Sequence, residues 1–163
     1  MKKIYFDHNA TTPVVEEVFD AMLPYLKEEW GNPSSIHWAG RGPRKAIDDA
    51  REKVCAFLNC VPVELIFTSS GSESDNLAIK GTAFAKKQKG NHIITTKVEH
   101  PAVLNTCKYL EREGFEVTYL DVDAYGLINL DELKKAITAK TILITVMYVN
   151  NETGVIMPVE EIG

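Results

Sequence analysis

Three separated stretches of the sequence carry side chains suited to holding a charged ligand. They are TSSGSESDN at 68–76, EHPAV at 99–103 and NNETG at 150–154. Small and hydroxyl residues ahead of a helix leave backbone N–H groups open, and such a loop can hold an anion. The other two stretches offer a histidine and a pair of asparagines. The residue types therefore predict an anion-binding loop with polar groups nearby.

The first stretch places Ser70, Gly71 and Ser72 just before a helix that we expect to start near Glu73. A helix start presents unpaired N–H groups and a partial positive charge, and a phosphate fits there. Gly71 lets the backbone approach the ligand closely. The Ser72 hydroxyl can donate to a phosphate oxygen, or it can cap the helix with Asp75 at the third helical position. The loop is neither a Walker loop nor G-x-G-x-x-G, so both interpretations stay open.

The histidine and the asparagines each have a structural and a functional interpretation. His100 is either the cap of a helix that opens at Pro101 or a site residue at the carboxyl edge of a strand. Asn150 and Asn151 are either an ordinary turn or polar groups that reach into a pocket. Their positions after apolar strand-like runs favour the functional interpretation.

The remaining sequence alternates between helical and strand-like patterns. Apolar spacing predicts helices at about 14–27, with a kink or interruption at Pro24, and at 43–58, 73–89, 101–113 and from 129. Strands are predicted at 64–68, 92–98, 115–122 and 141–149, the last as a strand buried on both faces. Further signals are Pro101 and Gly114 at the ends of one helix, and Asn129 with Glu132 at the start of another.

This order predicts an α/β fold with a mostly parallel sheet and helices on both faces. Ligands of such sheets bind outside the carboxyl ends of the strands. All three polar stretches follow predicted strands, so we expect them to lie near one another at that edge.

Composition limits the possible partners. The chain has 163 residues, of which 45% are hydrophobic and 25% charged, with a net charge of -5. The length suits one domain, and the negative charge favours neither nucleic acid nor an anionic membrane as partner. No apolar run of about 18 residues occurs, which argues against a membrane span or a secretory segment. We therefore expect a cytoplasmic protein.

The cysteines predict no metal site and no disulfide framework. Cys55, Cys60 and Cys107 are odd in number, and no C-x-x-C motif occurs. A reduced compartment suits them best. Cys107 falls on one helical face with Val103 and Leu110, so we expect small buried hydrophobic residues.

Taken together, the motifs resemble those of a known family. They are YFDHNATTP, GNPSSIH, FTSSGSESDNLAIKG, KVEHPAVLNTC, LEREGFEVTYL and VNNETGVIMPVEEIG. This set is similar, in order and over essentially the whole chain, to the amino-terminal part of the cysteine desulfurases. These are class V aminotransferase-like enzymes of fold type I that use pyridoxal 5'-phosphate. The resemblance implies a segment 1–13 followed by the amino-terminal part of the cofactor-binding large domain at 14–163.

The resemblance also implies roles for individual residues. Gly71 and Ser72 match the pair that holds the cofactor phosphate, while Ser70 stands where many relatives have glycine. His100 matches the histidine that stacks over the pyridine ring and takes part in proton transfers, which makes it the catalytic candidate. Asn151 matches the asparagine that bonds the phenolic oxygen of the ring. The implied reaction converts L-cysteine to L-alanine and leaves the sulfur as an enzyme persulfide.

The family reaction needs more groups than the matched positions supply. A Schiff-base lysine, an aspartate for the pyridine nitrogen and a nucleophilic cysteine lie beyond the matched region in relatives. None of Lys80, Lys97 and Lys108 occupies the position of that lysine. We therefore expect the chain to be a fragment that is inactive alone.

Implied partners are a second copy in a homodimer and an iron–sulfur scaffold or other sulfur acceptor protein. Selenocysteine lyase and cysteine-sulfinate desulfinase, which belong to the same family, remain alternatives, as does a non-catalytic module that binds a phosphate-bearing ligand.

Overall fold

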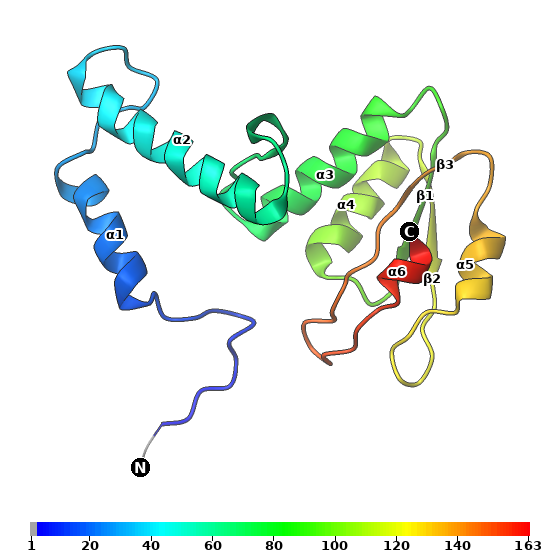
Figure 1. The fold of residues 1–163 in the computed structure, drawn as a ribbon. Coiled ribbons are helices and arrows are strands. Elements are labelled where there is room, and N and C mark those ends of the chain that lie inside the picture. Colours follow the sequence, from blue (N-terminus) through cyan, green and yellow to red (C-terminus); the bar gives the residue numbers. More distant parts are fainter. Residues whose placement is uncertain (1–2) are drawn as a thin grey trace. The chain divides into compact units, whose positions relative to one another are not determined.

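The computed structural model describes residues 3–163, which divide into two compact units (Figure 1). The first ends at Phe67 and the second runs from Thr68 to Gly163. The first unit contains α1 (Glu16–Lys27), α2 (Trp38–Leu58) and the short 3-10 helix η1 (Pro62–Glu64). The second contains three strands and four helices.

The helices of the first unit differ from the prediction at their prolines. Pro24 lies inside α1 without interrupting it. Helix α2 begins at Trp38 rather than Pro43, so Pro43 lies one turn inside it. The Ala39 carbonyl, which an N–H at position 43 would have bonded, instead lies so close to Gly31 that a side chain there would clash with it.

The predicted strand at 64–68 is wrong. These residues form no ladder with any strand in the part of the chain that the structure describes. The Arg51 guanidinium donates to the Leu65 carbonyl and lies over the Phe67 ring, 4.8 Å from its centroid. Leu65 and Phe67 thus lie along α2, and the β-type residues remain extended without a partner strand.

The second unit is built around a parallel sheet of three strands. They are β1 (His92–Thr96), β2 (Glu116–Leu120) and β3 (Thr141–Ile144), in the order β2-β1-β3. The helices are α3 (Gly71–Ala85), α4 (Pro101–Arg112), α5 (Leu130–Ala136) and α6 (Val159–Ile162). Helix α4 starts at Pro101 and ends just before Gly114, and Asn129 caps α5, as predicted.

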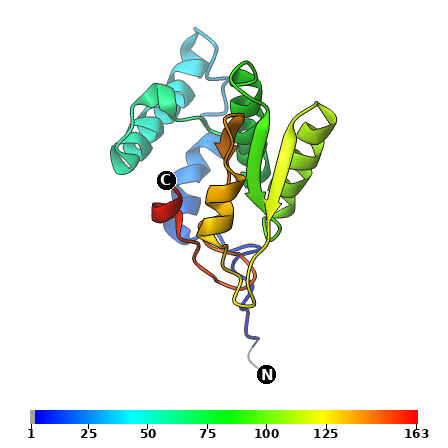
Figure 2. The same ribbon diagram turned by 90° about the vertical axis from the view of Figure 1, so that its right-hand side faces the viewer.

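Helices cover both faces of this sheet, which confirms the predicted fold class. Successive residues of β1 point to opposite faces. Ile93 packs in a core with residues of α3 and α4, whereas Ile94 packs in a second core with residues of α5. Figures 1 and 2 show α3 and α4 on one side of the strands and α5 on the other.

Strand β3 is shorter than the apolar run that predicted it. The Thr145 N–H still donates to the Ile94 carbonyl at 2.9 Å, but the Met147 N–H donates to the Glu99 carboxylate at 2.7 Å. A side chain thus replaces the neighbouring strand as the acceptor, and the ladder ends. The strand is also only half-buried, because it is the edge of the sheet within the described residues.

A buried histidine on β1 bonds side chains of both neighbouring strands near the amino edge of the sheet. His92 on β1 pairs its Nδ1 with the Thr141 hydroxyl at 2.8 Å and its Nε2 with the Thr118 hydroxyl at 2.9 Å. All three strands are therefore joined at the edge opposite the polar stretches. Within residues 3–163, no helix has the length and apolar character needed to cross a bilayer.

Candidate functional site

The predicted anion-binding loop leads into α3, but the cap differs from the prediction. The helix begins at Gly71, and the Ser70 hydroxyl accepts from the Glu73 N–H at 3.2 Å. The Glu73 carboxylate accepts from both the N–H and the hydroxyl of Ser69 at 2.7 Å, and these bonds lower the pKa of Glu73. Capping by Ser72 with Asp75 is therefore wrong, because the helix starts two residues earlier than expected.

This earlier start leaves Ser72 in the first turn with its hydroxyl uncommitted. Neither the N–H groups of Gly71 and Ser72 nor the Ser72 hydroxyl donates to any residue within 3–163. A Cβ built on Gly71 would meet no atom within 4 Å. Both residues are exposed, at the start of a 15-residue helix. Open donors, open space and the helix dipole together suit a phosphate group.

The second helix start carries the imidazole. His100 caps α4, since its Nδ1 accepts from the Ala102 N–H at 3.1 Å. A ring nitrogen that accepts carries no proton, so the neutral ring carries its proton on Nε2. The cap thus fixes the tautomer and leaves Nε2 for other partners. His100 therefore caps the helix through Nδ1 and at the same time presents the Nε2–H as a hydrogen-bond donor.

His100 and Asn151 lie in one cavity. Its volume is about 320 Å³. Its lining consists of Val98, Glu99, His100, Pro101, Asn150, Asn151, Glu152 and Thr153. The cavity thus joins the segment after β1 with the segment after β3, as expected for a carboxyl edge. Gly71 and Ser72 belong to the same unit but do not line it.

Asn150 holds the two sides of this cavity together. Its Nδ2 donates to the Val98 carbonyl at 3.2 Å, and its Oδ1 accepts from the N–H groups of Glu152 and Thr153, both at 2.9 Å. The turn interpretation of the asparagine pair is thus correct for Asn150. The turn that it builds presents Asn151 to the cavity.

Glu99 is a cavity residue that the sequence reasoning missed. It is only 6% exposed, and its Oε1 accepts from the Met147 N–H at 2.7 Å and the Thr96 hydroxyl at 3.1 Å. Burial raises the pKa of this carboxyl, and the nearby Asp75 carboxylate raises it further. Glu99 therefore ties the segment that carries His100 to the segment after β3. An acidic residue directly after a buried strand was the available signal.

Two of the lysines that do not match the Schiff-base position interact with other side chains. The Lys97 ammonium pairs with Asp121 at 2.6 Å. The Lys80 ammonium lies 4.4 Å from the centroid of the Tyr109 ring. Neither lines the cavity of His100 and Asn151.

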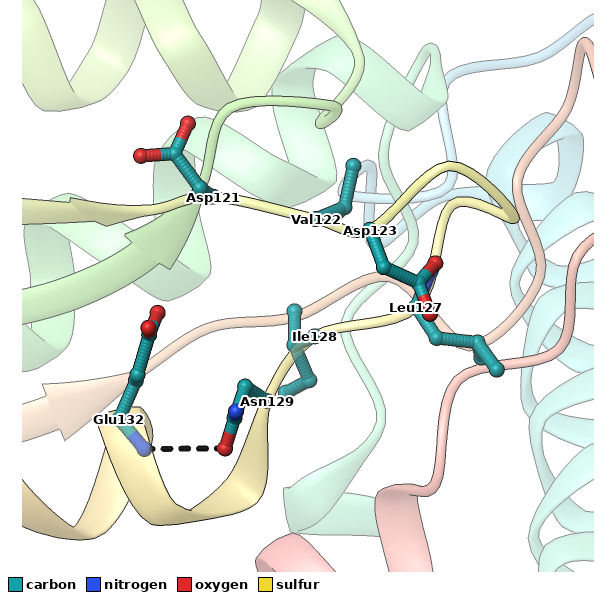
Figure 3. A pocket seen from close by; sticks show the side chains of 7 residues that line it. All are labelled: Asp121, Val122, Asp123, Leu127, Ile128, Asn129 and Glu132. Atoms are coloured by element: carbon teal, nitrogen blue, oxygen red, sulfur yellow. Dashed lines mark hydrogen bonds between the residues drawn. The ribbon is translucent and has the colours of Figure 1, made fainter.

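A second cavity in this unit is unsuited to an anion (Figure 3). Its volume is about 270 Å³, and the carboxylates of Asp121, Asp123 and Glu132 lie around it. Asn129 also lines it, but its Oδ1 accepts from the Glu132 N–H at 3.3 Å as part of the α5 cap. Among the described residues, no cluster of three or more His, Cys, Asp or Glu side chains could hold a metal ion.

Comparison with known proteins identifies the family. The aminotransferase class-V family model matches residues 4–163. A putative cysteine desulfurase, IscS 1 of Bacillus subtilis strain 168, is 53% identical over 163 residues, which is 100% of this chain and 43% of that protein. Cysteine desulfurase IscS of Methanosarcina thermophila is 56% identical over 162 residues, 99% of this chain and 40% of that protein. The chain thus spans about two-fifths of the length of these curated relatives.

Solved structures agree with these relatives. The structure of a NIFS-like protein superposes with a TM-score of 0.94 at 42% identity and covers 99% of this chain and 44% of its own. The structure of SspA in complex with cysteine superposes with a TM-score of 0.90 at 45% identity, over 97% of this chain and 46% of its own. The family expected from the motifs is confirmed: the chain belongs to the aminotransferase class-V family.

Proposed function

We propose that this chain is part of a pyridoxal-phosphate-dependent cysteine desulfurase, which converts L-cysteine to L-alanine and passes the sulfur to an acceptor. The observation that carries the proposal is the shared cavity of His100 and Asn151, which lies in the same unit as the open start of α3. The names of the relatives support the choice of reaction. The complex of the similar protein SspA with cysteine supports the choice of substrate.

The residues present fit the cofactor. The open N–H groups at Gly71 and Ser72 and the Ser72 hydroxyl would hold its phosphate. His100 would lie against its ring and Asn151 would bond the phenolic oxygen, since both side chains line one cavity. When bound, the cofactor supplies the electron sink for the bond cleavages at the substrate. The protein supplies orientation and the handling of protons.

His100 is the residue that we assign to proton handling. Its Nδ1 accepts from the Ala102 N–H, so the neutral ring offers the Nε2–H as a donor in the cavity. Proton transfer at Nε2 would require this cap bond to open, so that Nδ1 can take the proton and Nε2 can act as a base. Glu99 positions this residue rather than reacting, because its Oε1 is already bonded to Met147 and Thr96.

We further propose that the additional length found in relatives supplies the Schiff-base lysine, the aspartate and the nucleophilic cysteine. The ion pair of Lys97 and the ring contact of Lys80 support a Schiff-base lysine from that additional length, because both side chains already have other partners. A homodimer in the cytoplasm and a sulfur acceptor such as an iron–sulfur scaffold protein complete the proposal. The three unpaired thiols of this chain favour a reducing compartment.

The test measures alanine and sulfide released from L-cysteine by the whole protein, with L-selenocysteine and L-cysteine sulfinate as competing substrates. Replacing His100 with alanine should slow turnover by about 100-fold or more, the usual contribution of a positioned acid–base group. His100→Asn is the matched control for folding, because asparagine also caps helices well. It should keep the stability of the protein while remaining slow. Unchanged turnover in both variants would remove His100 from the mechanism, and absence of alanine from the unaltered protein would refute the desulfurase assignment.

A further inference from the structure

The end of α2 brings two cysteines together in the first unit. Cys55 lies in the last turn of the helix and is 3% exposed, whereas Cys60 follows the helix and is partly exposed. The Cys60 N–H donates to the Cys55 carbonyl at 3.0 Å. Sequence spacing did not indicate this pair, because five positions separate the two residues and no C-x-x-C motif marks them.

The turn between them explains this backbone bond. Asn59 adopts the left-handed conformation, with φ 53° and ψ 46°, and is the one non-glycine residue within 3–163 with a positive φ. A left-handed residue at position five and a bond from the N–H of position six to the carbonyl of position one define a Schellman motif, which frequently brings the first and sixth side chains close together. Cys55 and Cys60 occupy those two positions, and the backbone bond from the Cys60 N–H to the Cys55 carbonyl joins them.

We propose that Cys55 and Cys60 form a reversible disulfide with low-molecular-weight disulfides as the oxidant. The turn at Asn59 reverses the chain and joins the two residues by a backbone hydrogen bond, so closing the bridge requires little movement of the backbone. This inference is independent of the proposed desulfurase activity. It assigns the end of α2 as a site of oxidative modification.

The chemistry balances in two exchange steps. The Cys60 thiol loses its proton, and the thiolate attacks one sulfur of the small disulfide, whose S–S bond breaks to release one thiolate. The Cys55 thiolate then attacks the Cys60 sulfur and displaces the second small thiolate. The two protein thiols lose two electrons, the small disulfide gains them, and the two protons end on the released thiols.

The surroundings of the pair set the order of the steps. Burial raises the pKa of the Cys55 thiol and the Cys60 thiol raises it further, while the Arg51 guanidinium lowers it and the Glu64 carboxylate raises it. The more exposed Cys60 therefore reacts first. Cys107 offers a contrast, because it is fully buried and burial raises its pKa to about 11.

The experiment exposes the purified protein to mixtures of reduced and oxidised glutathione, quenches with acid, alkylates free thiols and maps tryptic peptides by mass. Both cysteines fall in peptide 54–80, while Cys107 falls in peptide 98–108. A bridge removes two hydrogens, about 2 Da, and blocks alkylation of the first peptide. We expect half of the protein to be bridged at an oxidant level roughly tenfold below that which modifies Cys107.

Variants separate the steps. Cys55→Ser should leave a persistent mixed disulfide on Cys60. In Cys60→Ser, Cys55 should resist oxidation to the same degree as the buried Cys107. Asn59→Gly should keep bridging, because glycine adopts the left-handed conformation, whereas Asn59→Val should weaken it. A stable mixed disulfide on the unaltered protein would overturn the proposal. Oxidation of the pair no easier than that of Cys107 would do the same.

Discussion

Helices α3 and α4 pack against each other and against the same face of the sheet, but they use their first turns differently. At α4, the imidazole of His100 satisfies the Ala102 N–H, and Pro101 has no N–H to satisfy. At α3, the Ser70 cap satisfies Glu73, whereas Gly71 and Ser72 donate to no described residue. Both starts carry a side-chain cap, but only α3 keeps two backbone N–H groups that bond no described residue.

This difference suits the N-termini of α3 and α4 to different functions, although both carry the same kind of helix dipole. An open helix start can bind an anion, since the N–H groups of Gly71 and Ser72 donate to no described residue. A start capped by a ring nitrogen orients that ring, because the N–H acts as a fixed point for the imidazole. The proposed phosphate site and the proposed proton-handling group therefore come from the same kind of element, and the capping residue distinguishes them.

The largest expected effect concerns packing. Leu110 on α4 is fully buried, whereas Leu77 on α3 is 48% exposed. Leu110→Ala should lower the free energy of unfolding by about 2–5 kcal/mol, through lost burial and a cavity. Leu77→Ala is the matched control and should cost far less, because much of its surface is already in water. Urea unfolding of both variants measures the difference, and equal losses would contradict the packing contrast.

The next effect concerns the open start. Ser72→Ala removes a hydroxyl that bonds no described residue, so the free energy of unfolding should hardly change. Binding of pyridoxal phosphate by the whole protein should weaken by about 1–2 kcal/mol, the value of one hydrogen bond to a charged group. Equilibrium dialysis against the cofactor measures the loss. Unaltered affinity would place the phosphate elsewhere.

Ser70→Ala should show the reverse pattern. It removes the cap of α3, whose hydroxyl accepts from Glu73 at 3.2 Å. Loss of a serine cap costs about 1 kcal/mol of stability. Cofactor affinity should fall less than in Ser72→Ala, because the open donors remain. If Ser70→Ala were the weaker binder of the two, the cap rather than the open start would govern phosphate binding.

How far the sequence predicted these features depends on whether local chemistry decides them. Pro101, Gly114 and Asn129 marked helix ends correctly, because their backbone and side-chain properties act within one turn. The strand at 64–68 was wrong because a strand needs a neighbour, and β-type residues cannot show whether one exists. The start of α2 was misplaced because its first residues include Gly40 and Gly42, whose low helix propensity gives no helical signal in the sequence.

Prediction of the site residues was limited in the same way. His100 and Asn151 were expected at one edge from strand order alone, and they line one cavity. Ser72 was considered as either a phosphate donor or the cap, and Ser70 was not considered as the cap, since several neighbouring serines offer the same hydroxyl. Glu99 was missed because its role depends on an N–H donor 48 residues away, on Met147.

The smallest expected effect concerns Glu99, which lies next to the start of α4, and the pH dependence of stability. Its folded pKa lies above the ordinary value of 4.5, chiefly because of burial. Between those two values the folded protein binds more protons than the unfolded chain, so the stability contributed by this carboxyl falls as pH rises. Glu99→Gln keeps an acceptor for Met147 and Thr96 but cannot ionise.

The unfolding free energy of the unaltered protein, relative to that of Glu99→Gln, should therefore decline as pH rises from below 4.5 through the raised pKa and then level off. Denaturation midpoints across that pH range provide the measurement. A difference that grew with pH would mean that the ionised carboxylate, rather than the neutral acid, is the form that holds the two segments together.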